Sequence, residues 1–165
     1  MAIEERSIKV EVRASADGQS IEGYASVFDS LSQDLGGFRE LVKPGAFKRA
    51  LAESPDILCV VGHDPDKLLG RTMSGTCEVE EDERGLKFRC KMPNTGLGRD
   101  MKELISRGDM NECSFKFSLD PNDDDAEDWD ESEGFVRRTI RSVARLYDVS
   151  VCLEGAYRAT SVKVA

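Results

Sequence analysis

Short runs in which apolar and polar residues alternate recur along this chain, and a period of two is typical of β-strands with one buried face. The segments "SIKVEVRAS" and "IEGYASVFDS" alternate in this way, and "ADGQ" between them predicts the turn of an opening hairpin. The segment "TMSGTCEVEEDERGLKFRCKMP" predicts a second hairpin that turns at "EDERG". The alternation therefore favours a fold built mainly from antiparallel strands.

Further strands are predicted in the middle and near the end of the chain. The short apolar run "DILCVVGH" predicts a central strand that ends at His63, followed by a loop, "DPDKLLGR". The segment "NECSFKFSLD" alternates and predicts another strand. The segment "GFVRRTIRSVARLYDVSVCLE" alternates over a length that exceeds a usual strand, so it predicts two strands with a bend or one long curled strand.

Two segments carry a helical period instead. "LVKPGAFKRALAES" predicts a helix with Pro44 in its first turn, where a missing N–H costs nothing. "NTGLGRDMKELISRGDM" predicts a second helix, capped by Asn94 or Thr95. Because 165 residues suit one domain and strands outnumber helices, we expect a single mostly β (α+β) domain, residues 1–165, in which helices flank an antiparallel β-barrel or sandwich.

The formal net charge is −9, and much of it lies in "NDDDAEDWDESE". An acidic surface does not displace counterions from nucleic acid, so the charge excludes sequence-independent nucleic-acid binding. The acidic segment, residues 120–134, predicts a solvated, mobile loop within the domain. A calcium-binding loop is the alternative, but the glycine and the ligand spacing of an EF-hand are absent.

The chain has five cysteines, no C-x-x-C pair and one histidine. This pattern predicts buried free thiols in a reducing cytoplasm and disfavours a metal cluster, so we expect neither metal nor cofactor. No apolar run approaches the roughly 20 residues that cross a bilayer. The N-terminus lacks the basic and apolar regions of a signal peptide, so we expect the chain to stay where it is made, without a membrane partner.

Three residues stand at positions that suit chemistry: His63 at a strand end, Ser114 at a strand start, and Asp148 where it interrupts an apolar strand. A serine hydroxyl needs a base within hydrogen-bond reach, and imidazole, with an ordinary pKa of about 6.5, supplies one at neutral pH. A carboxylate then fixes the tautomer of the imidazole and stabilises its protonated form. These residues would supply the parts of a serine hydrolase site.

The residue types alone leave other interpretations open. A lone histidine is more often structural than catalytic, and serine hydroxyls are common in strands. Asp148 can instead pair with Arg141 or Arg145 on the sheet surface.

Several motifs in series resemble the prohead proteases of tailed bacteriophages, serine proteases that cleave capsid and scaffold proteins during head maturation. The resemblance runs from about residue 20 to residue 160, in the family's order and approximate spacing. Its most specific parts are a histidine loop, a serine-phenylalanine strand start and a late strand with an acid before V-S. The matching segments are "EGYASVFDS", "FRELVKPGAF", "VVGHDPDKLLGRT", "GLKFRCKMPNT", "LISRGDMNECSFKF" and "LYDVSVCLEGAYRAT".

The resemblance implies a role for each candidate residue. His63 matches the family's catalytic histidine and would be the general base, and Ser114 matches its nucleophilic serine. Asp148 falls where the family places an acid, usually glutamate, and would complete a triad; otherwise His63 and Ser114 act as a dyad. The pattern also selects Ser114 over Cys113, since neighbours in a strand face opposite sides and only one can meet His63.

The family is similar in fold to the herpesvirus assembly proteases (assemblins), which implies an antiparallel β-barrel of that type surrounded by a few helices. In those proteases an arginine-bearing loop helps to form the oxyanion hole, so Arg137 and Arg138 are candidates by position. The alternative is that both arginines balance the acidic loop. One departure is Gly155, which stands where the family usually has proline.

The resemblance also implies partners and a location. The substrates would be the major capsid protein and its scaffold segment, with cleavage of the protease itself and with self-association as a possibility, in the bacterial host cytoplasm inside the assembling prohead. A catalytically silent capsid-assembly or scaffold-like protein is the alternative, and it would keep His63 and Ser114 apart in a closed surface. An esterase of small substrates would need a deep pocket, and the chain lacks the G-x-S-x-G of the usual esterase fold.

Overall fold

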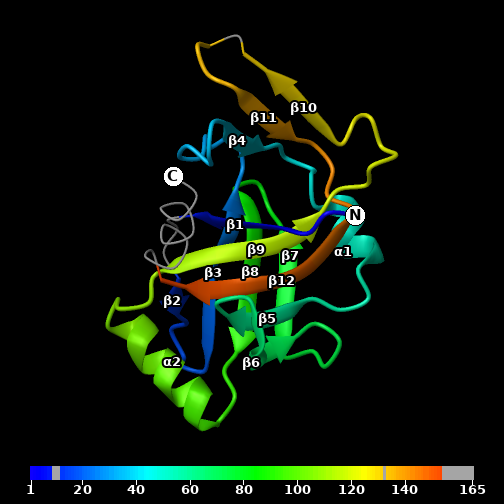
Figure 1. The fold of residues 1–165 in the computed structure, drawn as a ribbon. Helices are drawn as coiled ribbons and strands as arrows, with labels where there is room; N and C mark the ends of the chain where they lie inside the picture. Colours follow the sequence, from blue (N-terminus) through cyan, green and yellow to red (C-terminus); the bar gives the residue numbers. More distant parts are fainter. Residues whose placement is uncertain (9–11, 132, 154–165) are drawn as a thin grey trace.

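The computed structural model describes residues 1–8, 12–131 and 133–153 (Figure 1). The end of the family resemblance, residues 154–160 with Gly155, lies outside the described residues. In chain order the elements are β1 (Glu4–Ile8), β2 (Arg13–Ala14), β3 (Ser20–Val27), β4 (Arg39–Val42), α1 (Lys48–Glu53), β5 (Leu58–Val61), β6 (Asp64–Arg71), β7 (Cys77–Glu81), β8 (Gly85–Lys91), α2 (Gly96–Ser106), β9 (Glu112–Ser118), β10 (Glu127–Asp130), β11 (Arg137–Ile140) and β12 (Arg145–Cys152).

The described strands form three sheets. Five strands pair in the order β1-β9-β12-β5-β6, four in the order β2-β3-β8-β7, and three in the order β10-β11-β4. The prediction of a mostly β fold with few helices is confirmed. Among the described strands the closed antiparallel barrel is not observed, because the pairing of the five-stranded sheet stops at β1 and β6 and the three sheets stay open. Two pairs are also parallel, β12 with β5 and β11 with β4.

The core lies between the five-stranded and four-stranded sheets. Phe115 and Phe117 of β9 point into it, where the ring of Phe115 meets the edge of Phe47, which lies just before α1. Phe88 of β8 enters from the other sheet. Each of these rings is fully buried, which stabilises the fold by about 1.5–3 kcal/mol per side chain. The packing leaves the opposite face of β9 available for polar residues.

The opening hairpin is only partly as predicted. β2 pairs with β3 across the expected turn, but β1 leaves the hairpin and runs beside β9 (Figure 1). The pairing is antiparallel and sets Ser7 opposite Ser114. The second hairpin is confirmed as β7 and β8. The long alternating segment near the end forms two strands with a bend, β11 and β12.

The first predicted helix is shorter than its sequence pattern. The chain turns at Pro44 and Gly45, where Gly45 has a φ of +91°, and α1 begins only at Lys48. A glycine in this left-handed region breaks a helical run. Glu81 of β7 accepts hydrogen bonds from the amides of Gly45 and Phe47, at 2.7 and 3.0 Å, and so holds the turn.

The second helix follows its prediction closely. Thr95 caps α2 by accepting a hydrogen bond from the amide of Gly98 at 3.0 Å, and Met101 and Ile105 are buried on its inner face. Neither described helix has the length and apolar character that crossing a membrane requires.

The segment "DPDKLLGR" was predicted as a loop but forms the edge strand β6. Proline is tolerated in edge strands and at bulges, and the β5–β6 pairing shifts register twice near Val60. The acidic segment also contains a strand, β10, in place of a continuous loop. Its carboxylates pair with arginines that follow it in the chain, since Arg137 bonds Asp130 at 3.0 Å and Arg141 bonds Asp128 at 2.7 Å.

Candidate active site

His63 lies in the tight turn that joins β5 to β6. Gly62 and His63 are the two turn residues, and both have positive φ angles, +60° and +59°. Positive φ at both positions is the geometry of a turn that matches strand twist, but it is uncommon for a residue with a Cβ. Two contacts to β12 hold the turn: the Gly62 amide donates to the Val151 carbonyl at 3.0 Å, and the His63 amide donates to Ser150 Oγ at 2.8 Å. The turn therefore projects the imidazole over β12.

The structure brings the three predicted catalytic residues into contact. His63 Nε2 lies 2.6 Å from Ser114 Oγ, and His63 Nδ1 lies 2.6 Å from Asp148 Oδ1. Ser114 is on β9 and Asp148 on β12, and in the β9–β12 ladder Ser114 faces Ser150 while Lys116 faces Asp148. The period of two along each strand places these side chains on the same face of the sheet. Hydroxyl, imidazole and carboxylate thus form a continuous chain of hydrogen bonds.

The hydrogen-bonded side chains of Ser114, His63 and Asp148 are shielded from solvent. Ser114 is fully buried, the Asp148 residue is 5% exposed, and the His63 side chain is 11% exposed. Hydrogen bonds are stronger in such surroundings than in water. A buried carboxylate also needs partners, and Asp148 receives them from His63, from Ser150 Oγ at 3.4 Å and from the Lys116 ammonium at 3.9 Å. The arrangement supplies a nucleophile, a base and an anion that supports the protonated base.

Comparison with known proteins agrees with this geometry. Residues 6–165 match the family described as Caudovirus prohead serine protease. This chain belongs to that family. It is also 30% identical over 149 residues to the prohead protease of Enterobacteria phage HK97, an alignment that covers 87% of this chain and 60% of the relative. The chain therefore spans about 60% of the length of that relative. No solved structure matches the chain.

Two residues of this candidate site were missed in the sequence. Ser150 accepts the His63 amide and lies 3.3 Å from His63 Nδ1. Lys116 donates to the His63 carbonyl at 3.5 Å and pairs with Glu5 at 3.0 Å. The available signal was the period of two, which puts Ser150 on the face of Asp148 and Lys116 on the face of Ser114.

Cys113 lies on the opposite side of β9 from Ser114. Its side chain points into the core and is fully buried. Burial raises the pKa of the Cys113 thiol, and the nearby Cys152 and Glu112 raise it further. The thiolate that would compete as a nucleophile is therefore disfavoured, in agreement with the choice of Ser114.

Arg137 and Arg138, the candidates for the oxyanion hole, bond to carboxylates. Arg138 is buried and contacts Glu4 at 2.6 Å, Glu40 at 3.1 Å and Glu127 at 2.5 Å. Burial alone would lower the pKa of Arg138, but these carboxylates outweigh it and raise the pKa. Arg137 pairs with residues 130 and 133 of the acidic segment. An oxyanion role for either arginine stays a prediction.

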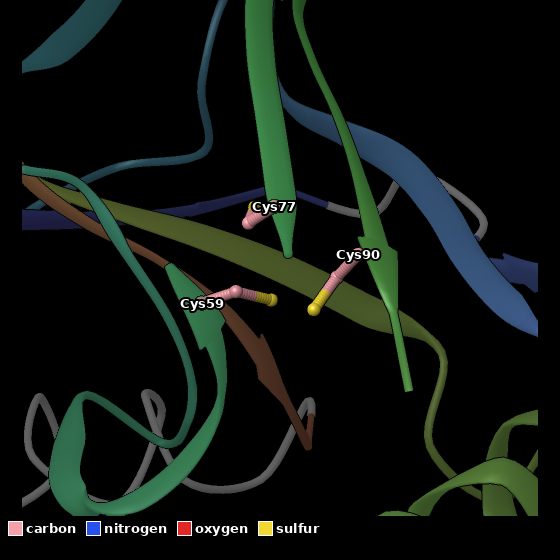
Figure 2. A group of neighbouring side chains, drawn as sticks. All are labelled: Cys59, Cys77 and Cys90. Carbon is pink, nitrogen blue, oxygen red and sulfur yellow. The ribbon is translucent and has the colours of Figure 1, made fainter. Parts of the chain in front are cut away.

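Three buried cysteines come together on β5, β7 and β8 (Figure 2). The sulfurs of Cys59, Cys77 and Cys90 all lie within 4.8 Å of one another, and a Cβ on Gly70 would stand only 2.6 Å from the Cys90 sulfur. Sequence spacing gave no sign of this trio because each member is on a different strand.

Thiolates are ligands for soft metal ions, but a closed zinc site takes four ligands. Three thiolates around a divalent ion would also bury a net negative charge, and the nearby carboxylate of Glu78 has the same sign. The trio thus fits the packing of small apolar side chains better than a metal shell. The predicted burial of free thiols is confirmed for all five cysteines.

Proposed function

We propose that this chain is a serine endopeptidase of phage head maturation, which cleaves the capsid protein and its scaffold segment inside the prohead and also cleaves itself. The observation that carries the proposal is the pair of 2.6 Å contacts that joins Ser114, His63 and Asp148. Membership of a prohead serine protease family supports the substrate class and the location. The contact between Ser114 and His63 also favours an enzyme over a silent assembly protein, which has no need of it.

The mechanism follows from the roles of these atoms. Ser114 Oγ attacks the carbonyl carbon of the scissile peptide while His63 Nε2 accepts the hydroxyl proton. The Asp148 carboxylate accepts a hydrogen bond from the N–H at Nδ1, which fixes the tautomer, and its charge stabilises the imidazolium. His63 then gives its proton to the departing amine, which leaves an acyl-enzyme on Ser114. A water molecule, deprotonated by His63, hydrolyses the ester and restores the serine.

Co-expression with the cognate capsid protein tests the proposal. We expect the wild-type chain to shorten the capsid protein, as read by intact mass, and the Ser114→Ala variant to leave it whole. Ser118→Ala is a matched control, because Ser118 is also fully buried and lies on the same face of β9. The control should process the capsid protein as the wild type does. Equal processing by the Ser114→Ala variant would reject Ser114 as the nucleophile, and no processing by any form would favour the silent assembly protein.

A further inference from the structure

The nucleophile of the proposed protease is covered by the chain's own first strand. β1 pairs with β9 so that Ser7 lies opposite Ser114, and Ser114 Oγ donates a hydrogen bond to the Arg6 carbonyl at 2.8 Å. Ser114 has no exposed surface in this arrangement. Attack on a peptide requires its carbonyl carbon to approach Oγ to about 3–3.5 Å. A carbonyl group of β1 already occupies the hydrogen-bonding position beside the hydroxyl.

The Arg6 contact also opposes activation of the serine. A hydroxyl has one proton, and Ser114 Oγ has two acceptors within reach, the Arg6 carbonyl and His63 Nε2 at 2.6 Å. If the proton goes to Arg6, Nε2 must carry its own hydrogen, and Nδ1 then turns a lone pair toward Asp148 unless the ring is charged. The productive tautomer has the hydrogen on Nδ1 and a free lone pair on Nε2. Release of the Arg6 carbonyl therefore favours the active arrangement.

β1 is attached in a way that permits its exchange. It is an edge strand, paired with β9 alone among the described strands, and all five of its residues are only half-buried. Besides backbone hydrogen bonds, ion pairs hold it: Glu4 bonds Arg138 at 2.6 Å, Glu5 bonds Lys116 at 3.0 Å and Arg6 bonds Glu40 at 2.9 Å. It contributes no buried apolar side chain to the described core and touches the core through the Arg6 guanidinium, 5.7 Å from the centre of the Phe117 ring. Another extended chain can form the same backbone ladder on β9.

We propose that β1 is an internal stand-in for the substrate, and that an extended segment of the substrate protein displaces it and pairs antiparallel with β9. The proposal rests on the proposed protease function. It adds a docking edge, which is the edge of β9 that β1 covers, and a closed state, in which β1 is paired there. In the closed state the Arg6 carbonyl accepts the hydrogen bond from Ser114 Oγ. In the open state a carbonyl group of the substrate lies beside Ser114 Oγ instead.

The surroundings of Arg6 indicate which segment fits. Its guanidinium donates to both oxygens of Glu40, at 2.9 and 3.2 Å, and Glu40 is almost fully buried. Removing one of the cations beside a buried carboxylate is costly. A substrate segment that brings a basic side chain to Glu40 would restore the pairing when β1 leaves. We therefore infer that the docking edge takes an extended segment with a basic residue.

A disulfide lock tests whether β1 must move. Ile8 lies directly opposite Cys113 in the β1–β9 pair, and residues opposed in this way have Cα separations that a disulfide spans. In the Ile8→Cys variant, oxidised glutathione should join the new thiol to Cys113, which non-reducing peptide mapping verifies. We expect the oxidised form to lose cleavage of the capsid protein and labelling of Ser114 by a fluorophosphonate, and the reductant to restore both. Ile8→Ser, given the same treatment, is the control and should stay active.

The variant Arg6→Gln tests the role of β1 even if the buried Cys113 thiol does not form the disulfide. Arg6→Gln weakens the attachment to Glu40, and we expect fluorophosphonate labelling to become about tenfold faster, as loss of one charge-assisted hydrogen bond implies. Arg13→Gln, which removes the ion pair between the exposed Arg13 of β2 and Glu22 of β3, should leave the rate unchanged. Equal labelling of oxidised and reduced Ile8→Cys, or no acceleration in Arg6→Gln, would overturn the role of β1. Absence of labelling and cleavage in every form would instead reject the protease itself, and this inference with it.

Discussion

The backbone amide of His63 donates a hydrogen bond to Ser150 Oγ at 2.8 Å, which ties the turn that holds the imidazole to the strand that carries Asp148. The same hydroxyl lies 3.3 Å from His63 Nδ1 and 3.4 Å from Asp148 Oδ1. One buried side chain therefore positions both the proposed base, His63, and its carboxylate partner, Asp148. Ser150 acts through these two residues and is a positioning residue.

Removal of the Ser150 hydroxyl should slow catalysis without weakening substrate binding. In Ser150→Ala the half-buried amide of His63 loses its acceptor, which costs about 1–3 kcal/mol and loosens the turn. We expect kcat for a capsid-derived peptide to fall about 10- to 100-fold while KM stays near the wild-type value. Ser150→Thr keeps the hydroxyl and should recover most of the rate. A proportional rise in KM, or a Thr variant as slow as Ala, would show that Ser150 only supports packing.

Replacement of Asp148 distinguishes a triad from a dyad. In Asp148→Asn the amide can donate to His63 Nδ1, which leaves the hydrogen on Nε2 and removes the acceptor for the Ser114 proton. For a working triad we expect the labelling rate of Ser114 by a fluorophosphonate to drop about 10³- to 10⁴-fold. The melting temperature serves as the check that the variant folds. A drop of less than about tenfold in a folded variant would indicate a His63–Ser114 dyad.

Gly62 is needed for its backbone conformation rather than for space. A Cβ at this position would meet nothing within 4 Å, but the φ of +60° is strained for any other residue. Gly62→Ala should lower the free energy of unfolding by about 1–2 kcal/mol and reduce activity by shifting His63. Gly96→Ala is the control, because Gly96 also has open space around it and begins α2 without positive φ. Urea titration should show the control unchanged or stabilised by about 0.4–1 kcal/mol.

The strands of the fold were largely predictable because alternation is a local property of the sequence. β3, β7, β8 and β9 follow their alternating segments, and Thr95 caps α2 as its residue type suggests. The partner of β1 was not predictable, since its local pattern fits the opening hairpin as well as β9. Only the packing of distant segments decides between the two pairings.

In the candidate site, too, sequence patterns indicated single residues but not the contacts between residues far apart in the chain. His63 and Ser114 were candidates by their positions in the sequence and received their roles from the family resemblance, and the structure places their side chains in contact. For Ser150 the period of two indicated only that it shares a face with Asp148, because its contact is with the main chain of His63, 87 positions away. The acidic segment looked like a loop because its neutralising arginines, Arg137 and Arg141, come later in the chain.

Cys113 should be dispensable for catalysis although it adjoins the proposed nucleophile, Ser114. Its thiol points into the core and its pKa is raised by burial, so it cannot take over from Ser114. Cys113→Ala should keep the wild-type kcat while lowering the free energy of unfolding by about 1 kcal/mol through lost packing. Peptide cleavage and urea titration measure the two quantities. A large loss of kcat in the folded variant would contradict the placement of Cys113 and Ser114 on opposite faces of β9.

Acid should weaken the attachment of β1 through Glu4. Burial alone would raise the pKa of Glu4, but the hydrogen bond and charge of Arg138 and the charge of Arg6 outweigh it and hold the pKa below the ordinary 4.5. A carboxyl group with a depressed pKa contributes its full stabilisation above the unfolded value and loses it as pH falls through the folded value. We therefore expect the difference in unfolding free energy between wild type and Glu4→Gln to shrink as the pH is lowered from about 6 to about 3. Glu53→Gln, at an exposed ion pair on α1, should show a smaller difference throughout. A wild-type advantage over Glu4→Gln that is constant with pH would show that Glu4 holds β1 by packing rather than by charge.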